Sequence, residues 1–387
     1  MKSAKQLLSE NRDFAEEMFR KIDKKMSVVT KRSRNKLADG VDGQGIHKST
    51  RPENWTSGFW PGLNYLLYER TKNPDYLETA RGLELAMDKG LEKFDTLSHD
   101  VGFMWHIVSV TNYRLSGDEA SRRRALFAAA TLSSRFILGG NFIRAWNEWD
   151  PPVGNEGWTI IDCLMNLPIL YFASAELRDD RFKRIAMAHA DMALRDHLRP
   201  DGSVAHIVEH NRETGEAVRT YGGQGIREGS SWSRGQAWAL YGFVLSYLHT
   251  GEMRYLDGAK QVANYFISNC CDDWLPRIDF RAPAEPVYYD STAGACAACG
   301  LIELAKALPE DEGGMYMNAA VNILRAMGER FMDFSEETDC MLNFGSVRYP
   351  TSEFSDDPYH ISIIYGDYFY TEAILKLIGS EFQPWLI

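Results

Sequence analysis

The sequence lacks the features that would place the protein in a membrane or on a nucleic acid. No apolar run reaches the length of about 18 residues that a membrane-spanning helix requires. Lysine and arginine total 43 against 54 aspartate and glutamate residues, and the net charge of −11 argues against nucleic acid or an anionic membrane as a partner. The first residues form an amphipathic pattern without the apolar stretch of a signal peptide. We therefore expect a cytoplasmic protein, or a periplasmic one if a leader segment precedes this sequence.

The sequence also has little cysteine and no familiar metal or nucleotide motif. The spacing of its six cysteines is not that of a disulfide framework, and reduced thiols fit a cytoplasmic protein. Cys296 and Cys299 have the C-x-x-C spacing, but the alanine and glycine residues around them favour close helix packing over metal binding. His206 and His210 are four residues apart in a strand pattern, where they do not share a helix face. The glycine-rich stretch 222–229 follows no strand–helix–strand unit and indicates a turn. These patterns therefore favour neither a metal site nor a dinucleotide site.

Apolar residues recur with the 3.6-residue period of α-helices along most of the chain. The predicted helices cover residues 4–26, 56–71, 75–92, 101–115, 118–138, 159–176, 180–197, 231–250, 253–269, 290–308, 313–333 and 365–379. Short connections such as 115–119 and 249–253 contain helix-capping residues, which favours pairing of successive helices into hairpins. No stretch has the composition of a linker, so we predict a single domain over residues 1–387.

The predicted helices are of two kinds, and the two kinds alternate. The helices that are apolar or small on nearly all sides, which is typical of buried helices, are 56–71, 159–176, 231–250 and 290–308. The amphipathic helices are 75–92, 118–138, 180–197 and 313–333. This alternation predicts an all-α fold, an (α/α)6 barrel in which an outer ring of helices wraps an inner ring. An open α-solenoid is the alternative, but no fixed repeat period is visible.

Polar and aromatic residues gather just before or at the start of the predicted inner helices. These clusters cover residues 54–60, 99–103, 159–162, 230–236, 289–292 and 365–370. Each cluster alone could be a helix cap, because Asp, Ser and Thr are common capping residues. In a ring of parallel inner helices, however, all the N-termini face one end, so the clusters would surround one mouth. The long loops 139–158, 198–230 and 334–364 would wall it, and residues 203–221 of the second have the pattern of a β-hairpin.

Two aspartates in these clusters, Asp100 and Asp162, are the candidate catalytic groups. Asp162 lies in the strongly apolar stretch Thr-Ile-Ile-Asp-Cys-Leu-Met-Asn-Leu. Burial raises the pKa of a carboxyl group, and a second carboxylate nearby raises it further. Asp162 could therefore hold a proton near neutral pH and act as a general acid, unless it only bonds backbone amides or an arginine at a helix start. Paired carboxylates among 10 tryptophans and 18 tyrosines are typical of sugar chemistry.

Five motifs in their order carry a family resemblance that covers the chain from Trp55 to about Leu377. They are His-Asp-Val-Gly-Phe (99–103), Ile-Asp-Cys-Leu-x-Asn-Leu-Pro (161–168), Trp-Ser-Arg-Gly-Gln-Ala-Trp (232–238), Asp-Ser-x-Ala (290–293) and Tyr-Gly-Asp-Tyr-x-Tyr (365–370). Together they resemble glycoside hydrolase family 88, the unsaturated glucuronyl hydrolases. The resemblance implies an (α/α)6 barrel that hydrates the C4=C5 double bond which polysaccharide lyases leave on a non-reducing uronic acid. Asp162 would protonate C4 and help to activate the water that adds at C5, while Asp100 would hold the substrate and keep Asp162 protonated. The resemblance also implies that neither a metal nor an organic cofactor is needed.

The same resemblance implies a binding site for a small anionic oligosaccharide, with unsaturated glycosaminoglycan disaccharides as the expected substrates. The residues expected to pack on sugar rings are Trp55, Trp146 and Trp238. The residues expected to contact hydroxyl or carboxylate groups are His99, His206, Gln224 and Arg234. Arg234 is the expected charge partner of the uronic acid, because its planar guanidinium matches a carboxylate.

Three other functions stay open at this point, as does the choice between a monomer and a homodimer. An unsaturated rhamnogalacturonyl hydrolase shares part of the 232–238 motif. An ordinary inverting glycosidase would use Asp162 as acid and Asp100 as base, with their carboxyl groups about 6.5–9.5 Å apart. A carbohydrate-binding scaffold would need no catalysis. Because the loop 344–360 contains Asp356 and Asp357 and only Arg348 as a basic side chain, we also expect a weak preference for unsulfated or lightly sulfated disaccharides.

Overall fold

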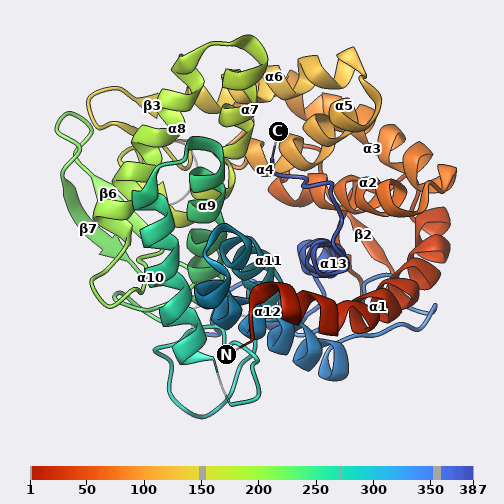
Figure 1. The fold of residues 1–387 in the computed structure, drawn as a ribbon. Coiled ribbons are helices and arrows are strands. Elements are labelled where there is room, and N and C mark those ends of the chain that lie inside the picture. Colours follow the sequence, from red (N-terminus) through yellow and green to blue (C-terminus); the bar gives the residue numbers. More distant parts are fainter. Residues whose placement is uncertain (1, 148–153, 271, 352–358, 387) are drawn as a thin grey trace.

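Helices arranged in a ring dominate the computed structural model, which describes residues 2–147, 154–270, 272–351 and 359–386 (Figure 1). The inner helices, most of whose residues are buried, are α2 (Phe59–Thr71), α4 (Val101–Trp105) with its continuation η3 (His106–Val110) and α5 (Thr111–Ser116), α7 (Pro168–Leu177), α9 (Ser233–Thr250), α11 (Ser291–Ala307) and α13 (Ile364–Ile378). The outer helices, which bury one face, are α1 (Ala4–Arg32), α3 (Pro74–Glu92), α6 (Glu119–Ser133), α8 (Asp180–Met192) with η5 (Ala193–His197), α10 (Met253–Asn269) and α12 (Glu310–Arg330). Inner and outer helices alternate along the chain, as the apolar pattern predicted.

The two ends of the chain close the ring. Helix α13 packs against α2 as well as α11, and α1 packs against α12 and α3. In an open solenoid the first and last hairpins would not meet. The closure therefore confirms the predicted (α/α)6 barrel and excludes the solenoid.

The predicted helix boundaries differ from the observed ones where local strands or turns intervene. The first helix continues past residue 26 to Arg32, because Val29 and Thr30 stay buried on its inner face. Helix α6 ends before residue 138, since β3 (Phe136–Ile137) pairs with β4 (Phe142–Ile143) instead. The predicted helix 159–176 begins as strand β5 (Trp158–Ile160) and the 3₁₀ turn η4 (Ile161–Met165), and α7 starts only at Pro168.

Loops at the starts of the inner helices carry the small sheets. Strand β6 (Ile207–His210) pairs with β7 (Ala217–Tyr221), which confirms the predicted hairpin, and β5 joins them as a third strand. Two further hairpins consist of β1 (Ala38–Val41) with β2 (His47–Ser49), and β8 (Gly345–Ser346) with β9 (Tyr359–Ile361). Neither was predicted.

The last described residues fill the middle of the ring. Figure 1 shows the C-terminus inside the ring of helices rather than at its rim. Trp385 is only 1% exposed there, and its ring lies parallel to those of His106 and Phe369, with centroids 5.4 Å and 6.2 Å away. Its indole N–H donates to Glu372 Oε2 at 2.9 Å. The chain end is therefore part of the core.

Helix α11 shows what the two spaced cysteines do. Cys296 and Cys299 are fully buried in a helix that packs against both α9 and α13. The thiol of Cys299 donates to the main-chain oxygen of Phe369 at 3.2 Å. This confirms that the C-x-x-C spacing serves helix packing.

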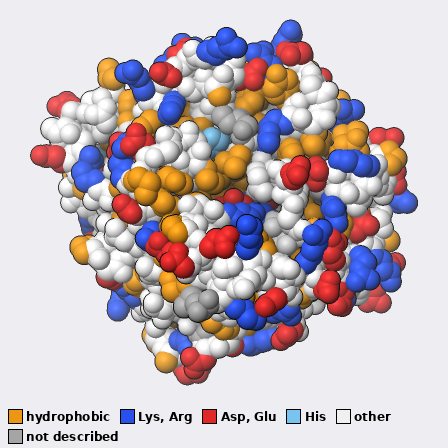
Figure 2. Space-filling model, in the orientation of Figure 1, with side chains coloured by type: hydrophobic (Ala, Val, Ile, Leu, Met, Phe, Trp, Pro, Cys, Tyr) orange, Lys and Arg blue, Asp and Glu red, His pale blue; other side chains and the backbone are white. Residues whose placement is uncertain are grey.

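The surface agrees with the charge balance of the sequence. On the face drawn in Figure 2, lysine and arginine side chains are interspersed with aspartate and glutamate, so this face offers no continuous basic surface. None of the described helices is long and apolar enough to cross a membrane.

Candidate active site

A cavity of about 780 Å³ opens where the starts of the inner helices meet the loops. Its volume is within the range typical of small-molecule sites. Of the residues predicted for the site, those that line this cavity are Trp55, His99, Asp100, Trp146, Asp162, His206, Gln224 and Arg234. They come from segments up to 179 residues apart in the sequence, and the fold gathers them around one mouth, as predicted from the positions of the clusters.

A small antiparallel sheet places Asp162 beside His206. Ile160, the last residue of β5, lies opposite Ile207 in β6, and the N–H of Ile161 donates to His206 O at 3.0 Å. The chain then turns into η4, which holds Asp162 with its Oδ1 3.7 Å from His206 Nε2. The expectation that Asp162 starts an α-helix was wrong, because strand pairing ahead of Pro168 delays α7.

The carboxyl group of Asp162 keeps its proton up to an unusually high pH. Its side chain is only 19% exposed, and its buried Oδ1 has no hydrogen-bond partner among the described residues. Burial, together with the negative charge of Asp100, raises its pKa to about 7, although Arg234 acts in the opposite direction. A carboxyl group with this pKa can donate a proton near neutral pH and can take one back.

The histidine beside Asp162 is a neutral N–H donor. Burial lowers the pKa of His206 to about 3, so its ring is uncharged near neutral pH. The main-chain N–H of Gln224 donates to His206 Nδ1 at 3.0 Å. This contact favours the tautomer with the ring proton on Nε2, the nitrogen that faces Asp162.

Asp100 occupies the position before α4 but does not cap that helix with its side chain. Its Oδ2 accepts from Ser98 Oγ at 3.1 Å, and its Oδ1 accepts from Asn166 Nδ2 at 3.4 Å. The same Asn166 amide donates to the main-chain oxygen of Asp162 at 3.4 Å, so it links the two aspartates. Gly102 makes this approach possible, because a Cβ there would lie 2.4 Å from Asn166 O. Asn166 belongs to a motif used for the resemblance, but it was not among the predicted site residues.

Arg234 lines the cavity, but its charge is already balanced. Its Nη1 donates to Asp290 Oδ2 at 3.0 Å and to Thr292 Oγ1 at 3.3 Å, and its Nη2 donates to Val347 O at 2.9 Å. Asp290 also caps α11 by accepting from the N–H of Thr292. Because Arg234 lines the cavity while sharing its charge with Asp290, its role as the charge partner of a uronic acid stays a prediction.

The predicted tryptophans separate into two groups. Trp55 is partly buried at the cavity wall, with its ring centroid 5.0 Å from that of Tyr365, and Trp146 lies similarly near Trp158 at 5.9 Å. Trp238 is fully buried and does not line the cavity. It packs 5.2 Å from Phe103, inside the ring, which corrects its expected role as a sugar-contacting residue.

The other lining residues were not named as site residues in advance, although all of them except those of the β1–β2 hairpin lie in the clusters and loops predicted to surround the mouth. They are Asp39, Gly40, Val41, Asp42, Gly43 and Lys48 of the β1–β2 hairpin, with Asn54, Thr56, Ile160, Val347, His360, Ile361, Ser362, Ile363 and Tyr365. The hairpin lies between two predicted helices and carries no aromatic or motif signal. Among the described residues, no group of three or more His, Cys, Asp or Glu side chains is arranged to hold a metal ion.

Comparison with known proteins identifies the family. No family model matches the chain. It is 35% identical over 358 residues to an unsaturated glucuronyl hydrolase of Bacillus sp. (strain GL1), an alignment that covers 90% of this chain and 94% of that protein. It is 31% identical to an unsaturated chondroitin disaccharide hydrolase of Streptococcus pneumoniae (strain ATCC BAA-255 / R6), over 83% of this chain and 81% of that one.

The structures agree with the sequences. The crystal structure of unsaturated glucuronyl hydrolase from Bacillus sp. GL1 superposes on this fold with a TM-score of 0.86, at 33% identity, over 91% of this chain and 94% of that chain. The chain therefore belongs to the unsaturated glucuronyl hydrolases, glycoside hydrolase family 88.

Proposed function

We propose that this chain hydrates the C4=C5 double bond of an unsaturated glucuronic acid at the non-reducing end of glycosaminoglycan-type disaccharides. The uronic acid, now hydrated and opened to its keto form, and the aglycone sugar are then released. The observation that carries the proposal is Asp162, a largely buried carboxyl group with a pKa near 7, next to a second carboxylate in the cavity. Relatives of the chain that are named for unsaturated glucuronic acid or chondroitin disaccharides support this substrate class.

In the proposed reaction Asp162 acts first as an acid and then as a base. Its proton is transferred to C4, which leaves positive charge at C5 and on the ring oxygen. The Asp162 carboxylate then accepts a proton from a water molecule, and the oxygen of that water bonds to C5. The resulting hemiketal opens its ring and releases the aglycone sugar, so the proton and the water are both accounted for. Asp100 keeps the pKa of Asp162 raised and holds the substrate.

The substrate carboxylate would be bound mainly by neutral donors. Arg234 shares its charge with Asp290, whereas the Nε2–H of His206 points toward Asp162 and is uncommitted to any short hydrogen bond. Neutral donors bind an anion without holding Asp162 in its charged form as strongly as a free cation would. No organic or metal cofactor has a step in this mechanism. Either a monomer or a homodimer would be compatible with a cavity built from one chain.

The test is the loss of the ultraviolet absorbance of the double bond when the protein is mixed with lyase-generated unsaturated disaccharides. We expect the wild type to remove it and Asp162→Asn to lose activity by at least about a thousandfold, since the proton donor is gone. Asp179→Asn is a matched control, because Asp179 caps α8 at the surface and asparagine caps equally well. An active Asp162→Asn protein would contradict the mechanism, and cleavage of saturated glycosides with no loss of absorbance would indicate an ordinary glycosidase.

A further inference from the structure

The β1–β2 hairpin forms one wall of the cavity, and a bulge turns an acidic side chain onto that wall. Ala38 lies opposite Ser49 and Gly40 lies opposite Lys48, so Asp39 is an extra residue in β1. Such bulges redirect the side chain of the inserted residue. Asp39 and Lys48 both line the cavity as a result.

Gly40 lets the hairpin pack tightly against the start of α13. It forms a bridge with Ile363, and a Cβ at Gly40 would lie 2.7 Å from Ser362 O. This contact brings Asp39 near Tyr365. Burial and the negative charges of Asp290 and Asp39 raise the pKa of Tyr365, against the effect of Arg234. Asp39 therefore lies on the wall where Trp55 and Tyr365 present their rings.

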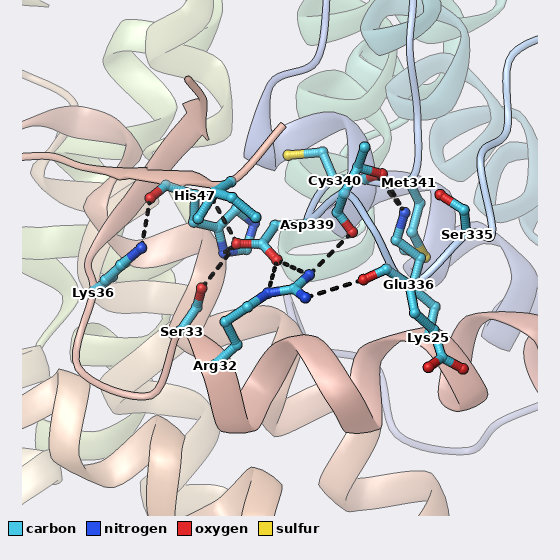
Figure 3. Close-up of polar contacts among 12 residues, drawn as sticks. Lys25, Arg32, Ser33, Lys36, His47, Ser335, Glu336, Asp339, Cys340 and Met341 are labelled. Carbon is cyan, nitrogen blue, oxygen red and sulfur yellow. Dashed lines mark hydrogen bonds and ion pairs between the residues drawn. The ribbon is translucent and has the colours of Figure 1, made fainter. Parts of the chain in front are cut away.

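The hairpin is anchored from behind by the fully buried carboxylate of Asp339 (Figure 3). Asp339 Oδ2 accepts from the main-chain N–H of His47 at 2.7 Å and from Ser33 Oγ at 3.1 Å, and its Oδ1 accepts from Arg32 Nε at 2.7 Å. Its own N–H donates to Gly45 O at 2.7 Å. Both the turn and strand β2 are thus fixed, so the side chains on the wall are held in place before a ligand binds.

The carboxylate of Asp39 has no partner of its own. No hydrogen bond or ion pair joins its side chain to another described residue, although it is partly buried. Asp42, three positions later, differs: it is exposed, and its Oδ1 accepts from the N–H groups of Gln44 and Ile46 in the turn. The Asp39 carboxylate is therefore available to a ligand, whereas that of Asp42 holds the turn.

How deeply each residue lies in the cavity determines which of the two sugars contacts the β1–β2 hairpin. The double bond is in the terminal sugar, which must reach the largely buried Asp162 and Asp100. The aglycone sugar must then lie toward the mouth, where the exposed Asp42 and Lys48 mark the outer end of the hairpin.

We propose that Asp39 is a specificity-determining residue for the aglycone sugar: its carboxylate accepts hydrogen bonds from hydroxyl or amide groups of that sugar and repels a sulfate ester in the same place. This rests on the proposed function, because it assigns the terminal uronic acid to the deep end of the cavity. The predicted preference for unsulfated disaccharides would then depend on Asp39. Asp356 and Asp357, from which that preference was predicted in the sequence, lie outside the described residues.

The experiment compares Asp39→Asn with the wild type on two unsaturated chondroitin disaccharides that differ only in a sulfate on the aglycone sugar. Asparagine keeps the shape and removes the charge. The ratio of kcat/KM for the sulfated over the unsulfated substrate should rise about tenfold, equivalent to about 1.4 kcal/mol, mostly through KM. Asp42→Asn removes the same charge from the same hairpin but keeps the turn acceptor, and it should change the ratio less than about twofold because exposed charges are screened.

Two outcomes would overturn the assignment of Asp39: an unchanged ratio in Asp39→Asn, or an equal rise in Asp42→Asn. A second measurement separates this inference from the proposed function. Calorimetric binding of both disaccharides to Asp162→Asn, with and without Asp39→Asn, should show the same tenfold change in the ratio of dissociation constants. If the wild type hydrolyses neither disaccharide but the binding ratio shifts, the proposed function fails and the role of Asp39 stands.

Discussion

Replacing Asp162 by asparagine should stabilise the folded protein at alkaline pH while it abolishes turnover. In the folded chain the pKa of Asp162 rises from 3.8 to about 7. Between these values the folded state keeps a proton that the unfolded state has released, so the free energy of unfolding falls as the pH rises through this interval. One pKa unit corresponds to about 1.36 kcal/mol, so about 3 units would cost at most about 4 kcal/mol. Because the side chain reaches solvent, we expect a gain of about 1–3 kcal/mol for the neutral asparagine at pH 8.

The measurement is denaturant unfolding of both proteins at a series of pH values from about 4 to about 8.5. The gain in Asp162→Asn should be largest above about pH 7, and it should vanish as the pH approaches the unfolded pKa of 3.8. Asparagine keeps the volume of the side chain, so the change isolates the charge.

Asp339→Asn is the matched control, for which the opposite sign is expected. Burial alone would raise the pKa of Asp339, but the N–H of His47 and the charge of Arg32 outweigh burial and lower it. A lowered pKa stabilises the fold above the unfolded value, and that stability is lost as the pH falls through the folded value. Asp339→Asn should therefore be destabilised at pH 8, by about 2–4 kcal/mol. If Asp162→Asn were no more stable than the wild type at pH 8, or if its gain did not depend on pH, the reasoning about desolvation would be refuted.

Three further predictions concern activity and packing. The initial rate of double-bond loss should fall as the pH rises through about 7, where Asp162 loses its proton. Any residual activity of Asp100→Asn should fall at a lower pH, because the negative charge that helps to raise the pKa of Asp162 is gone. A pH profile that is the same in both proteins would contradict this coupling. Trp55→Ala should raise KM by about tenfold, whereas Trp238→Phe should change KM less than about twofold and instead lower the melting temperature, so the reverse pattern would show that Trp238 contacts sugar. Trp385→Ala should lower the free energy of unfolding by about 3–5 kcal/mol, measured by denaturation, and an unaffected protein would mean that the chain end is not part of the core.

The ring could be predicted because its physical cause is local. A helix that is apolar on all sides, such as α9 or α11, must be covered on all sides, and an amphipathic helix such as α8 must cover something. The alternation of the two kinds along the chain is then enough to indicate two layers. The short strands could not be predicted in this way. β1 and β5 contain four and three residues and owe their existence to partners elsewhere in the chain, which a local pattern does not register.

The candidate acid could be predicted for the same reason, whereas the state of Arg234 could not. The apolar residues on both sides of Asp162 in the sequence predict directly that its carboxyl group is poorly solvated. The ion pair of Arg234 joins residues 56 positions apart, from two clusters that looked independent in the sequence. Both clusters do face one mouth, but whether an arginine there meets a ligand or a neighbour depends on side-chain directions that spacing alone does not determine.

Depth along the inner helices explains why Trp238 does not line the cavity. Arg234 and Trp238 share a helix face, but four residues place Trp238 about 6 Å further from the mouth. Tyr365 and Phe369 in α13 repeat the arrangement: the first residue lines the cavity and the second is fully buried. Trp238 and Phe369 lie 5.4 Å apart between ring centroids, so the second turns of these helices meet as an aromatic floor. The ring of Trp238 also lies 6.5 Å from that of Tyr365, so it packs beneath a residue of the cavity wall and supports that wall without contacting a ligand.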